Sequence, residues 1–237
     1  MTSDPSHASL RTDGFFVTRP LLDRRSIDWL AAATSGLEAG DATRRRDGGV
    51  YACRNLLAVS PGVKELAASP AIAAVVAPVL GGGWRCVRGI LFDKTPGANW
   101  KVAWHQDRSI AVKRRIDVDG FGPWSVKAGV PHVQPPRDVL ESLLTVRLHL
   151  DDCGEDNGPL KVLPGSHAHG VLDAGSVEQW RRERRPHVCV ASAGEALVMR
   201  PLLLHASSSA TRPGRRRVIH LEFAAGELPG GLEWEAA

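Results

Sequence analysis

The stretch Trp104-His105-Gln106-Asp107 is the part of the sequence from which both fold and chemistry can be predicted. In an extended strand successive side chains point to opposite faces, so His105 and Asp107 project side by side. Two histidines and one carboxylate on one face, with open positions opposite, are the arrangement that suits non-heme Fe(II). Because a lone His-x-Asp pair also arises by chance on surface strands, this interpretation requires a second histidine farther along the chain.

The best candidate for the third ligand is His205, which ends the apolar run Leu202-Leu203-Leu204. Other histidines remain alternatives. His149 and His220 lie within predicted strands and would fit equally well as hydrogen-bonded core residues. The remaining histidines lie in or beside predicted loops: His7, His132, His167, His169 and His187.

Arg216 is the candidate for binding an acidic co-substrate beside the metal. If the strands before and after Ala210 and Thr211 form a hairpin, cross-strand pairing places Arg216 opposite His205. A guanidinium suits this role because its planar fork can hold a carboxylate bidentately. By strand alternation, one face of this strand lines a cavity and carries Arg216, Val218, His220 and Glu222. The other, mainly apolar face should pack under helices. The alternative is that Arg215 to Arg217 form a basic turn.

Short β segments separated by glycine and proline dominate from Trp84 onward, and this pattern predicts a sandwich or barrel. The predicted strands are 84–92, 102–107, 143–150, 160–163, 187–191, 196–205 and 217–224. We expect a single domain over residues 1–237, with a helical preface at 1–83 and a β core at 84–237. In the preface we predict a short strand at 15–17, a loop at 42–49, and helices that begin after Asp23, Ser60 and Ser69, the first ending at Gly40.

Residues 110–137 form a long segment rich in glycine, proline and charge that directly follows the His-x-Asp pair. Long connections in compact domains are usually functional, so we expect a lid or a wall of the substrate site. Side chains in or near this segment that could meet a substrate are Trp100, Trp104, Trp124, Lys127 and His132. Aromatic residues there more often pack against the protein than bind a substrate.

We predict a surface helix at residues 176–185, which Pro186 would end.

Composition excludes several classes of protein. Hydrophobic residues make up 43% and charged residues 24% of the chain, which excludes a mainly disordered chain. Without a leader-like start or a long apolar run, we expect neither export nor membrane spanning. Four scattered cysteines predict neither disulfides nor a zinc site and fit a reducing cytoplasm. The net charge of +4 comes from arginine clusters, and no nucleic-acid recognition motif accompanies them. Any excess of positive charge is therefore better explained by an acidic small substrate than by nucleic-acid binding. Oligomeric state has no signal here.

Four segments together resemble a known family. They are Asp13-Gly14-Phe15-Phe16-Val17, then Trp104 to Asp107, then Asp156 to His167 (DNGPLKVLPGSH), and finally His205 with Ser207 and Arg216. In these segments the chain resembles the phytanoyl-CoA dioxygenase family of Fe(II)- and 2-oxoglutarate-dependent oxygenases. The resemblance implies a mainly β fold with flanking helices, the double-stranded β-helix or cupin-like jelly roll. It also implies that His105, Asp107 and His205 bind Fe(II), and that Arg216 and Ser207 bind the distal carboxylate of 2-oxoglutarate.

The resemblance further implies a reaction in which O2 and 2-oxoglutarate yield succinate and CO2 while a small organic substrate is hydroxylated. Relatives with a small residue in place of the carboxylate ligand halogenate, so Asp107 favours hydroxylation. A further contact to the co-substrate could come from Lys94, Asn99 or Lys101. Two alternatives stay open: a cupin-like protein that binds small molecules without catalysis, and a metal-dependent barrel enzyme that does not use 2-oxoglutarate. The second would leave Arg216 without a function.

Overall fold

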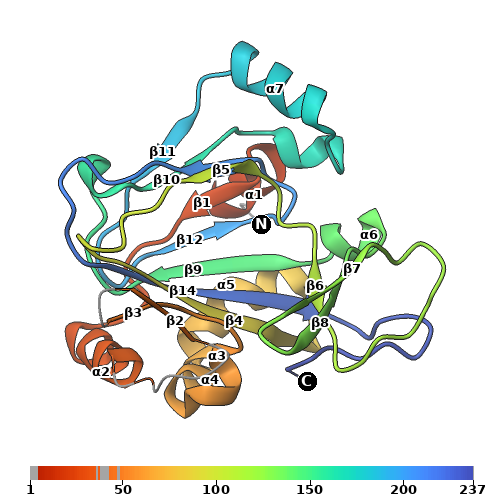
Figure 1. Cartoon of the computed structure of the whole chain (residues 1–237), viewed down its shortest axis with the longest axis horizontal. Helices are drawn as coiled ribbons and strands as arrows, with labels where there is room; N and C mark the ends of the chain where they lie inside the picture. The colour runs from red at the N-terminus through yellow and green to blue at the C-terminus, as the bar shows by residue number, and fades with distance from the viewer. Residues whose placement is uncertain (1–4, 36, 38–42, 47–48, 237) are drawn as a thin grey trace.

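Two facing β-sheets form the body of the protein in a computed structural model that describes residues 5–35, 37, 43–46 and 49–236 (Figure 1). The seven-stranded sheet has the order β1 (Phe15–Val17), β12 (Ala196–Met199), β9 (Leu144–His149), β14 (Arg216–Ala225), β4 (Trp84–Lys94), β3 (Gly49–Cys53), β2 (Thr43–Arg46). The four-stranded sheet has the order β11 (His187–Cys189), β10 (Leu160–Val162), β13 (His205–Ser207), β5 (Val102–His105). This antiparallel arrangement confirms the predicted double-stranded β-helix.

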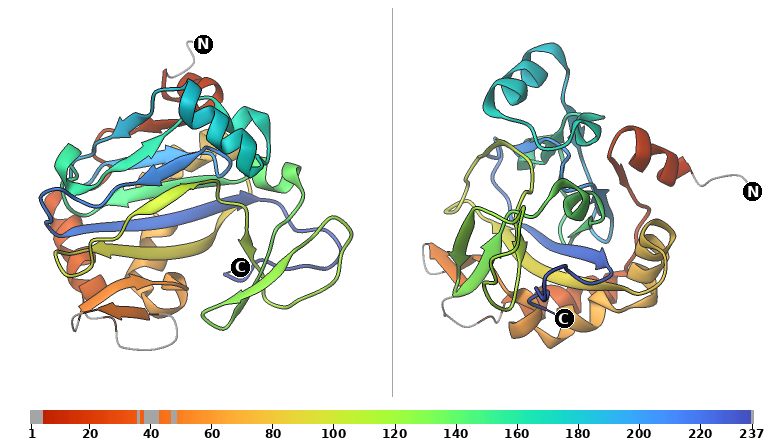
Figure 2. Two further views of the ribbon diagram at one scale, coloured as in Figure 1. Left: turned by 45° about the horizontal axis from the view of Figure 1, so that its top comes forward. Right: turned by 90° about the vertical axis from the view of Figure 1, so that its right-hand side faces the viewer.

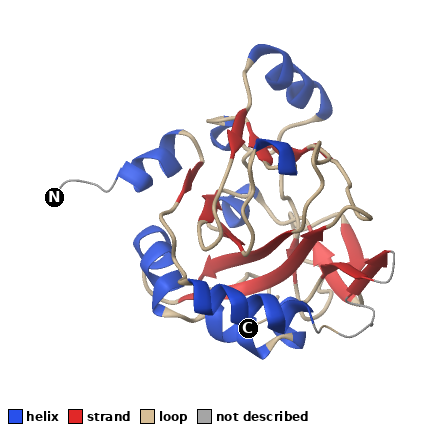
Figure 3. Ribbon diagram, turned by 90° about the vertical axis from the view of Figure 1, so that its left-hand side faces the viewer, coloured by secondary structure: helices blue, strands red, loops and turns tan. Residues whose placement is uncertain are grey.

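The helices lie mostly on the outer face of the large sheet, where Figure 3 shows them in blue. They are α1 (Pro5–Thr12), α2 (Arg24–Ser35), α3 (Leu56–Val59), α4 (Pro61–Ala67), α5 (Pro70–Leu80), α6 (Arg137–Glu141) and α7 (Ala174–Glu183), with 3-10 turns at Glu155–Asn157 and Ser166–His169. As predicted, Asp23 caps α2 by accepting a hydrogen bond from Ser26 N, and the Ser69 hydroxyl caps α5. The Ser60 side chain makes no such bond. The predicted end of the first helix, Gly40, lies outside the described residues.

The two faces of β14 confirm the alternation expected from the sequence. Ile219, Leu221 and Phe223 are fully buried in the core that also contains the apolar residues of α2, α4 and α5. The opposite face turns toward the four-stranded sheet and lines a cavity through Arg216, His220 and Glu222. The site therefore lies between the sheets, while the helices stabilise the large sheet from outside by apolar burial.

The strand predicted at 196–205 is wrong, because the chain changes sheets inside it. β12 pairs with β1 and β9 in the large sheet, whereas β13 pairs with β10 and β5 in the small one. Between them Leu203 N donates to Arg200 O at 3.0 Å, which closes a turn through Pro201. Leu202 to Leu204 are at most 1% exposed, so this buried turn has the composition of a strand.

The predicted hairpin that placed Arg216 opposite His205 is also wrong. Arg216 pairs with Lys94 on β4, in the sheet that faces His205. The expected hairpin tip is held elsewhere: Ala210 exchanges two hydrogen bonds with the Asn99 side chain, and Thr211 N donates to Asp156 O. These bonds use the backbone groups of a crossing loop, so the strands on either side cannot pair with each other.

Two segments contain more strands than the sequence indicates. In the helical preface, residues 43–46 form edge strand β2 where we predicted a loop, because their backbone pairs with β3. Residues 110–137 contain a three-stranded sheet, β6 (Ile110–Ala111), β8 (Val130–Val133) and β7 (Trp124–Lys127), which extends from the body (Figure 2). Among the described residues, no single helix is long and apolar enough to cross a membrane, although the bent pair α4 and α5 together meets that test.

Candidate metal centre

The structure brings the three predicted metal ligands together. His105 on β5 and His205 on β13 are direct cross-strand partners, and their ring centroids lie 4.1 Å apart. The carboxylate oxygens of Asp107 lie 3.7 Å from the Nε2 atom of each histidine. One ligand atom from each residue lies within 4.8 Å of the others, and no other such cluster occurs in the part of the chain that the structure describes.

Backbone carbonyl groups orient both imidazoles. The Nδ1 atoms of His105 and His205 each lie 2.8 Å from a carbonyl oxygen, that of Ala103 and Leu203 respectively. With Nδ1–H as the donor, the Nε2 lone pair is directed toward Asp107, as in histidines that bind metals. Burial lowers the pKa of His205 to about 4, so its imidazole is neutral near pH 7 and free to coordinate.

Asp107 carries the clearest sign that an ion belongs in this site. Its Oδ2 atom is buried and has no hydrogen-bond partner among the described residues. Burial alone would raise the pKa of Asp107, but electrostatic interaction with the neighbouring histidines and with Arg88 holds it well below its usual range. A carboxylate oxygen that is buried without a partner is costly, and a divalent cation bound between the three side chains would satisfy it. The residues present therefore fit Fe(II).

Gln106, between the two ligands of the motif, holds this strand in place from its other side. Its amide nitrogen donates to Gly170 O at 2.8 Å and to Leu202 O at 2.7 Å. Its amide oxygen accepts from Leu172 N at 2.8 Å. The side chain is 7% exposed, so all three bonds are sheltered from water. Sequence reasoning missed this role because the partners are loop residues distant in sequence.

A cavity of about 270 Å³ opens between the sheets beside the three ligands. At one end Arg216 is 5% exposed, donates from Nη1 to Gly158 O, and has a buried Nε without a partner among the described residues. Lys94, 2% exposed, donates to Ser208 O at 2.9 Å and lies 3.4 Å from the Ser207 hydroxyl. Burial and the nearby Arg216 lower the pKa of Lys94 to about 8. These groups form a cationic end suited to a carboxylate.

Of the three candidates for a further co-substrate contact, the structure favours Lys94. The Asn99 side chain is occupied by its two hydrogen bonds to Ala210, and Lys101 is exposed. Only Lys94 is buried beside Arg216.

A buried chain of polar side chains lines the floor of the cavity. Arg147 Nη1 lies 2.8 Å from His220 Nδ1, and His220 Nε2 lies 3.1 Å from Glu222. Glu222 also accepts from Arg88 Nη1 at 3.0 Å. Strand alternation predicted that His220 and Glu222 face the cavity. Sequence reasoning missed Arg147, although it lies two residues before His149 in the same predicted strand and therefore shares its face.

The competing histidines do not join the metal cluster. His220 is bound in the polar chain, and His149 is a buried residue of β9 that does not line the cavity. Among the suspected substrate residues, Trp100 and Lys127 line the cavity, whereas Trp124 packs against a separate apolar cluster.

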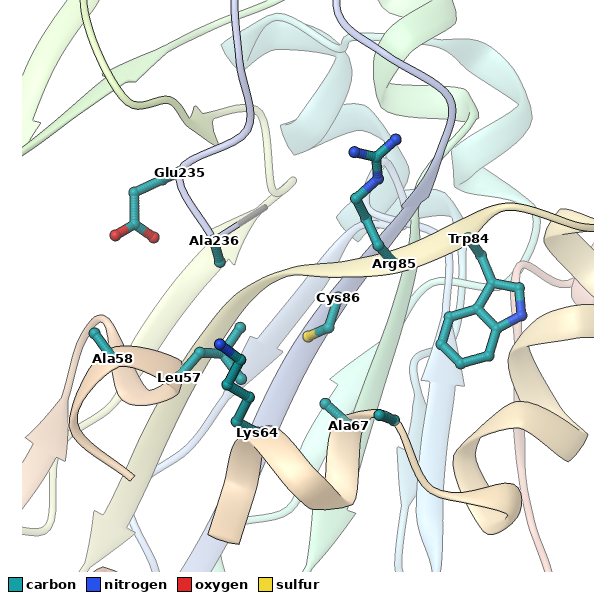
Figure 4. A pocket seen from close by; sticks show the side chains of 10 residues that line it. Leu57, Ala58, Lys64, Ala67, Trp84, Arg85, Cys86, Glu235 and Ala236 are labelled. Carbon is teal, nitrogen blue, oxygen red and sulfur yellow. The ribbon is translucent and has the colours of Figure 1, made fainter. Parts of the chain in front are cut away.

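A larger cavity of about 500 Å³ lies on the outer side of β4, between α3, α4 and the C-terminal segment (Figure 4). Its lining includes Leu57, Lys64, Trp84 and Cys86. Burial raises the pKa of the Cys86 thiol to about 12, which keeps it protonated and a poor metal ligand. No metal-ligating cluster lies there among the described residues, so the chemistry belongs to the smaller cavity.

Comparisons with known proteins agree with this site. A family model described as phytanoyl-CoA dioxygenase (PhyH) matches residues 10–218. The fold is similar to EctD from S. alaskensis, solved with 2-oxoglutarate and 5-hydroxyectoine, at a TM-score of 0.73, 20% identity, and coverage of 94% of this chain and 76% of that chain. AviO1 from Streptomyces viridochromogenes Tue57 is similar at a TM-score of 0.68 and 24% identity, with coverage of 97% and 98%. Comparison with curated proteins gave no match.

A third similar structure is SnoK, described as a non-heme alpha ketoglutarate dependent carbocyclase from nogalamycin biosynthesis. Its TM-score is 0.70 at 15% identity, with coverage of 95% of this chain and 85% of that chain. The fold is thus similar to that of a protein described as a carbocyclase as well as to that of EctD.

Proposed function

The chain belongs to the phytanoyl-CoA dioxygenase family, and from this premise we propose that it is an Fe(II)- and 2-oxoglutarate-dependent dioxygenase that hydroxylates a small organic substrate. The observation that carries the proposal is the convergence of two Nε2 atoms and one carboxylate within 4.8 Å, beside a buried cationic end of the same cavity. The EctD structure with 2-oxoglutarate and 5-hydroxyectoine supports the choice of hydroxylation.

In this proposal His105, Asp107 and His205 hold Fe(II). The bound metal would supply the redox chemistry by which O2 and 2-oxoglutarate yield succinate, CO2 and a hydroxylated product. The ionised Asp107 balances part of the metal charge, and the backbone carbonyls that accept from both Nδ1–H groups keep the imidazoles oriented with Nε2 toward the metal site. Because this chain would supply only three ligands, 2-oxoglutarate and O2 would still have access to the bound metal.

Arg216, Lys94 and Ser207 would hold the distal carboxylate of 2-oxoglutarate. Arg216 can contribute a bidentate pair, and Lys94 a second charge that is already buried and would gain a partner. Apolar side chains of Phe92, Val102 and Leu160 line the same cavity and limit the access of water. Since Arg54 from the helical preface also lines the cavity, we propose that preface and β core act as one domain.

The test follows succinate in protein loaded with Fe(II), 2-oxoglutarate, O2 and ascorbate, together with anaerobic binding of 2-oxoglutarate to the iron form. Arg216→Ala should abolish both signals, because it leaves the distal carboxylate without its bidentate partner. Arg212→Ala is a matched control, because this arginine is 86% exposed and makes only a 3.6 Å pair with Asp156. It should behave as the unaltered protein.

The outcomes separate the alternatives. Binding of 2-oxoglutarate without succinate, even with substrate extracts, would indicate a binding protein without catalysis. Metal binding without any 2-oxoglutarate binding would indicate a metal-dependent enzyme of another type. Once a substrate is found, a reaction under ¹⁸O2 should place one labelled atom in the product. An unlabelled product with succinate formation would instead indicate cyclisation or epimerisation.

A further inference from the structure

The cavity that contains the metal ligands has an excess of positive charge. Five cationic side chains and two carboxylates line it among the described residues. The five cations exceed the two carboxylates by three positive charges. Fe(II) carries two positive charges and 2-oxoglutarate carries two negative charges, so the binding of both leaves this excess unchanged. Glu222 is already paired with Arg88 at 3.0 Å, and Asp107 belongs to the metal. Such a low-dielectric cavity attracts an anionic ligand.

Lys127 is the cation of this cavity that is best placed to meet a substrate. It lies on β7, in the segment at 110–137, and its Nζ donates to the Ser109 hydroxyl at 2.8 Å. No carboxylate lies within ion-pairing distance of it among the described residues. An ammonium group has three donors, and the bond to Ser109 uses one of them. A half-buried cation without a counter-charge is costly, so a ligand anion would stabilise this arrangement.

Neighbouring positive charges also favour the binding of an anion near Lys127. Burial, followed by the positive charges of Arg88 and Arg54, lowers the pKa of Lys127 below its usual value. Arg88 also donates to the backbone oxygen of Ser109 at 3.4 Å, so Ser109 meets two cations. Because Ser109 lies two residues after the metal ligand Asp107, an anion bound at Lys127 lies in the same small cavity as the metal.

We propose that Lys127 recognises an acidic group of the substrate, and that the substrate is therefore a small organic anion. This inference rests on the proposed function, since it concerns the substrate side of the same cavity. The carbon skeleton would lie in the same cavity, whose lining includes the aromatic rings of Trp100 and Phe92. A volume of about 270 Å³ for co-substrate and substrate together lies just below the usual range of about 300–1,000 Å³ for ligand pockets, so the reacting part of the substrate is small.

The test compares butanoate with butanamide, which match in size and differ in charge. The protein is kept anaerobic with Fe(II) and saturating 2-oxoglutarate at constant ionic strength. Relaxation of the probe protons by the paramagnetic iron reports binding near the metal, and the Zn(II) form is the diamagnetic reference. We expect butanoate to bind about tenfold or more tightly than butanamide, as for loss of one charge-assisted hydrogen bond.

Variants assign this preference to Lys127. At equal occupancy of 2-oxoglutarate, Lys127→Met should weaken butanoate binding about tenfold or more, and Lys127→Arg should restore part of it. Lys113→Met is the matched control: it removes the same charge from the same segment, but Lys113 pairs with Glu233 at 3.0 Å outside the cavity. It should bind butanoate as the unaltered protein does.

Equal affinity for butanoate and butanamide, or unchanged butanoate affinity in Lys127→Met, would overturn the inference. The comparison of the two probes on the unaltered protein needs no variant, so a folding defect in Lys127→Met cannot hide the result. If the visible absorption of an iron–2-oxoglutarate complex never appears, the proposed co-substrate is wrong. The Zn(II) form, followed by saturation transfer from protein to probe, then still decides whether the cavity prefers the anion.

Discussion

Replacing Gln106 by methionine should destabilise the protein strongly although the side chain contacts neither metal nor co-substrate. Methionine keeps the length of the side chain and removes its polar atoms. The change breaks three sheltered hydrogen bonds, to Gly170 O, Leu202 O and Leu172 N. At about 1 to 1.5 kcal/mol for each bond, the free energy of unfolding should fall by about 3 to 4.5 kcal/mol. For a chain of this size that corresponds to a melting temperature lower by about 6 to 18 °C.

The assay is urea unfolding of metal-free protein, with thermal unfolding as a second measurement. An unchanged dependence on urea concentration would show that the loss comes from the folded state. Gln179→Met is the control, because Gln179 makes one exposed hydrogen bond to Glu183 on α7 and should cost at most about 0.5 kcal/mol. A loss below about 1 kcal/mol for Gln106→Met would refute the view that this amide holds the metal-binding strand in place.

Three further results are expected. Zn(II) at about 100 times its dissociation constant should stabilise the protein by about 2.7 kcal/mol, and His205→Ala should abolish this gain in thermal unfolding. Because the pKa of Lys94 is about 8, the protonated fraction falls about tenfold between about pH 7 and pH 9. The affinity for 2-oxoglutarate, titrated anaerobically, should fall with it, and a fall that persists in Lys94→Met would contradict this assignment. Gly158→Ala should cost about 2 to 4 kcal/mol in urea unfolding, since φ is +62° and the new Cβ would lie 2.6 Å from Ser208 O. Gly226→Ala, with φ of +83° and open space around it, should cost only about 1 to 2 kcal/mol.

Strand alternation made much of this site predictable. His105 and Asp107 converge as their spacing of two residues predicted, although β5 ends at His105 and Asp107 lies just beyond it, and the same rule placed His220 and Glu222 toward the cavity. These inferences need only local geometry and an apolar partner face. The family resemblance added the expectation that Arg216 meets the co-substrate.

The pairing of strands and the packing of sheets could not be predicted in the same way. Lys94 on β4 and Arg147 on β9 lie near Arg216 because both strands pair with β14 in the large sheet, and the facing sheet helps to bury them. The turn at Arg200 to Leu204 was mistaken for a strand because burial, rather than strand geometry, selects its leucines. Sequence patterns report which face is apolar, but not where the chain crosses between sheets.

Because the candidate metal ligands and the cations stand on different sheets, the distance between the sheets limits the length of the co-substrate. The imidazole ligands stand on β5 and β13 of one sheet, whereas Arg216 and Lys94 stand on β14 and β4 of the other. Facing sheets pack about 10 Å apart, a spacing set by the whole core. In the proposed site a shorter or longer dicarboxylic acid would therefore not reach both ends at once, and altering that preference would require a change in the spacing of the sheets as well as the exchange of a side chain.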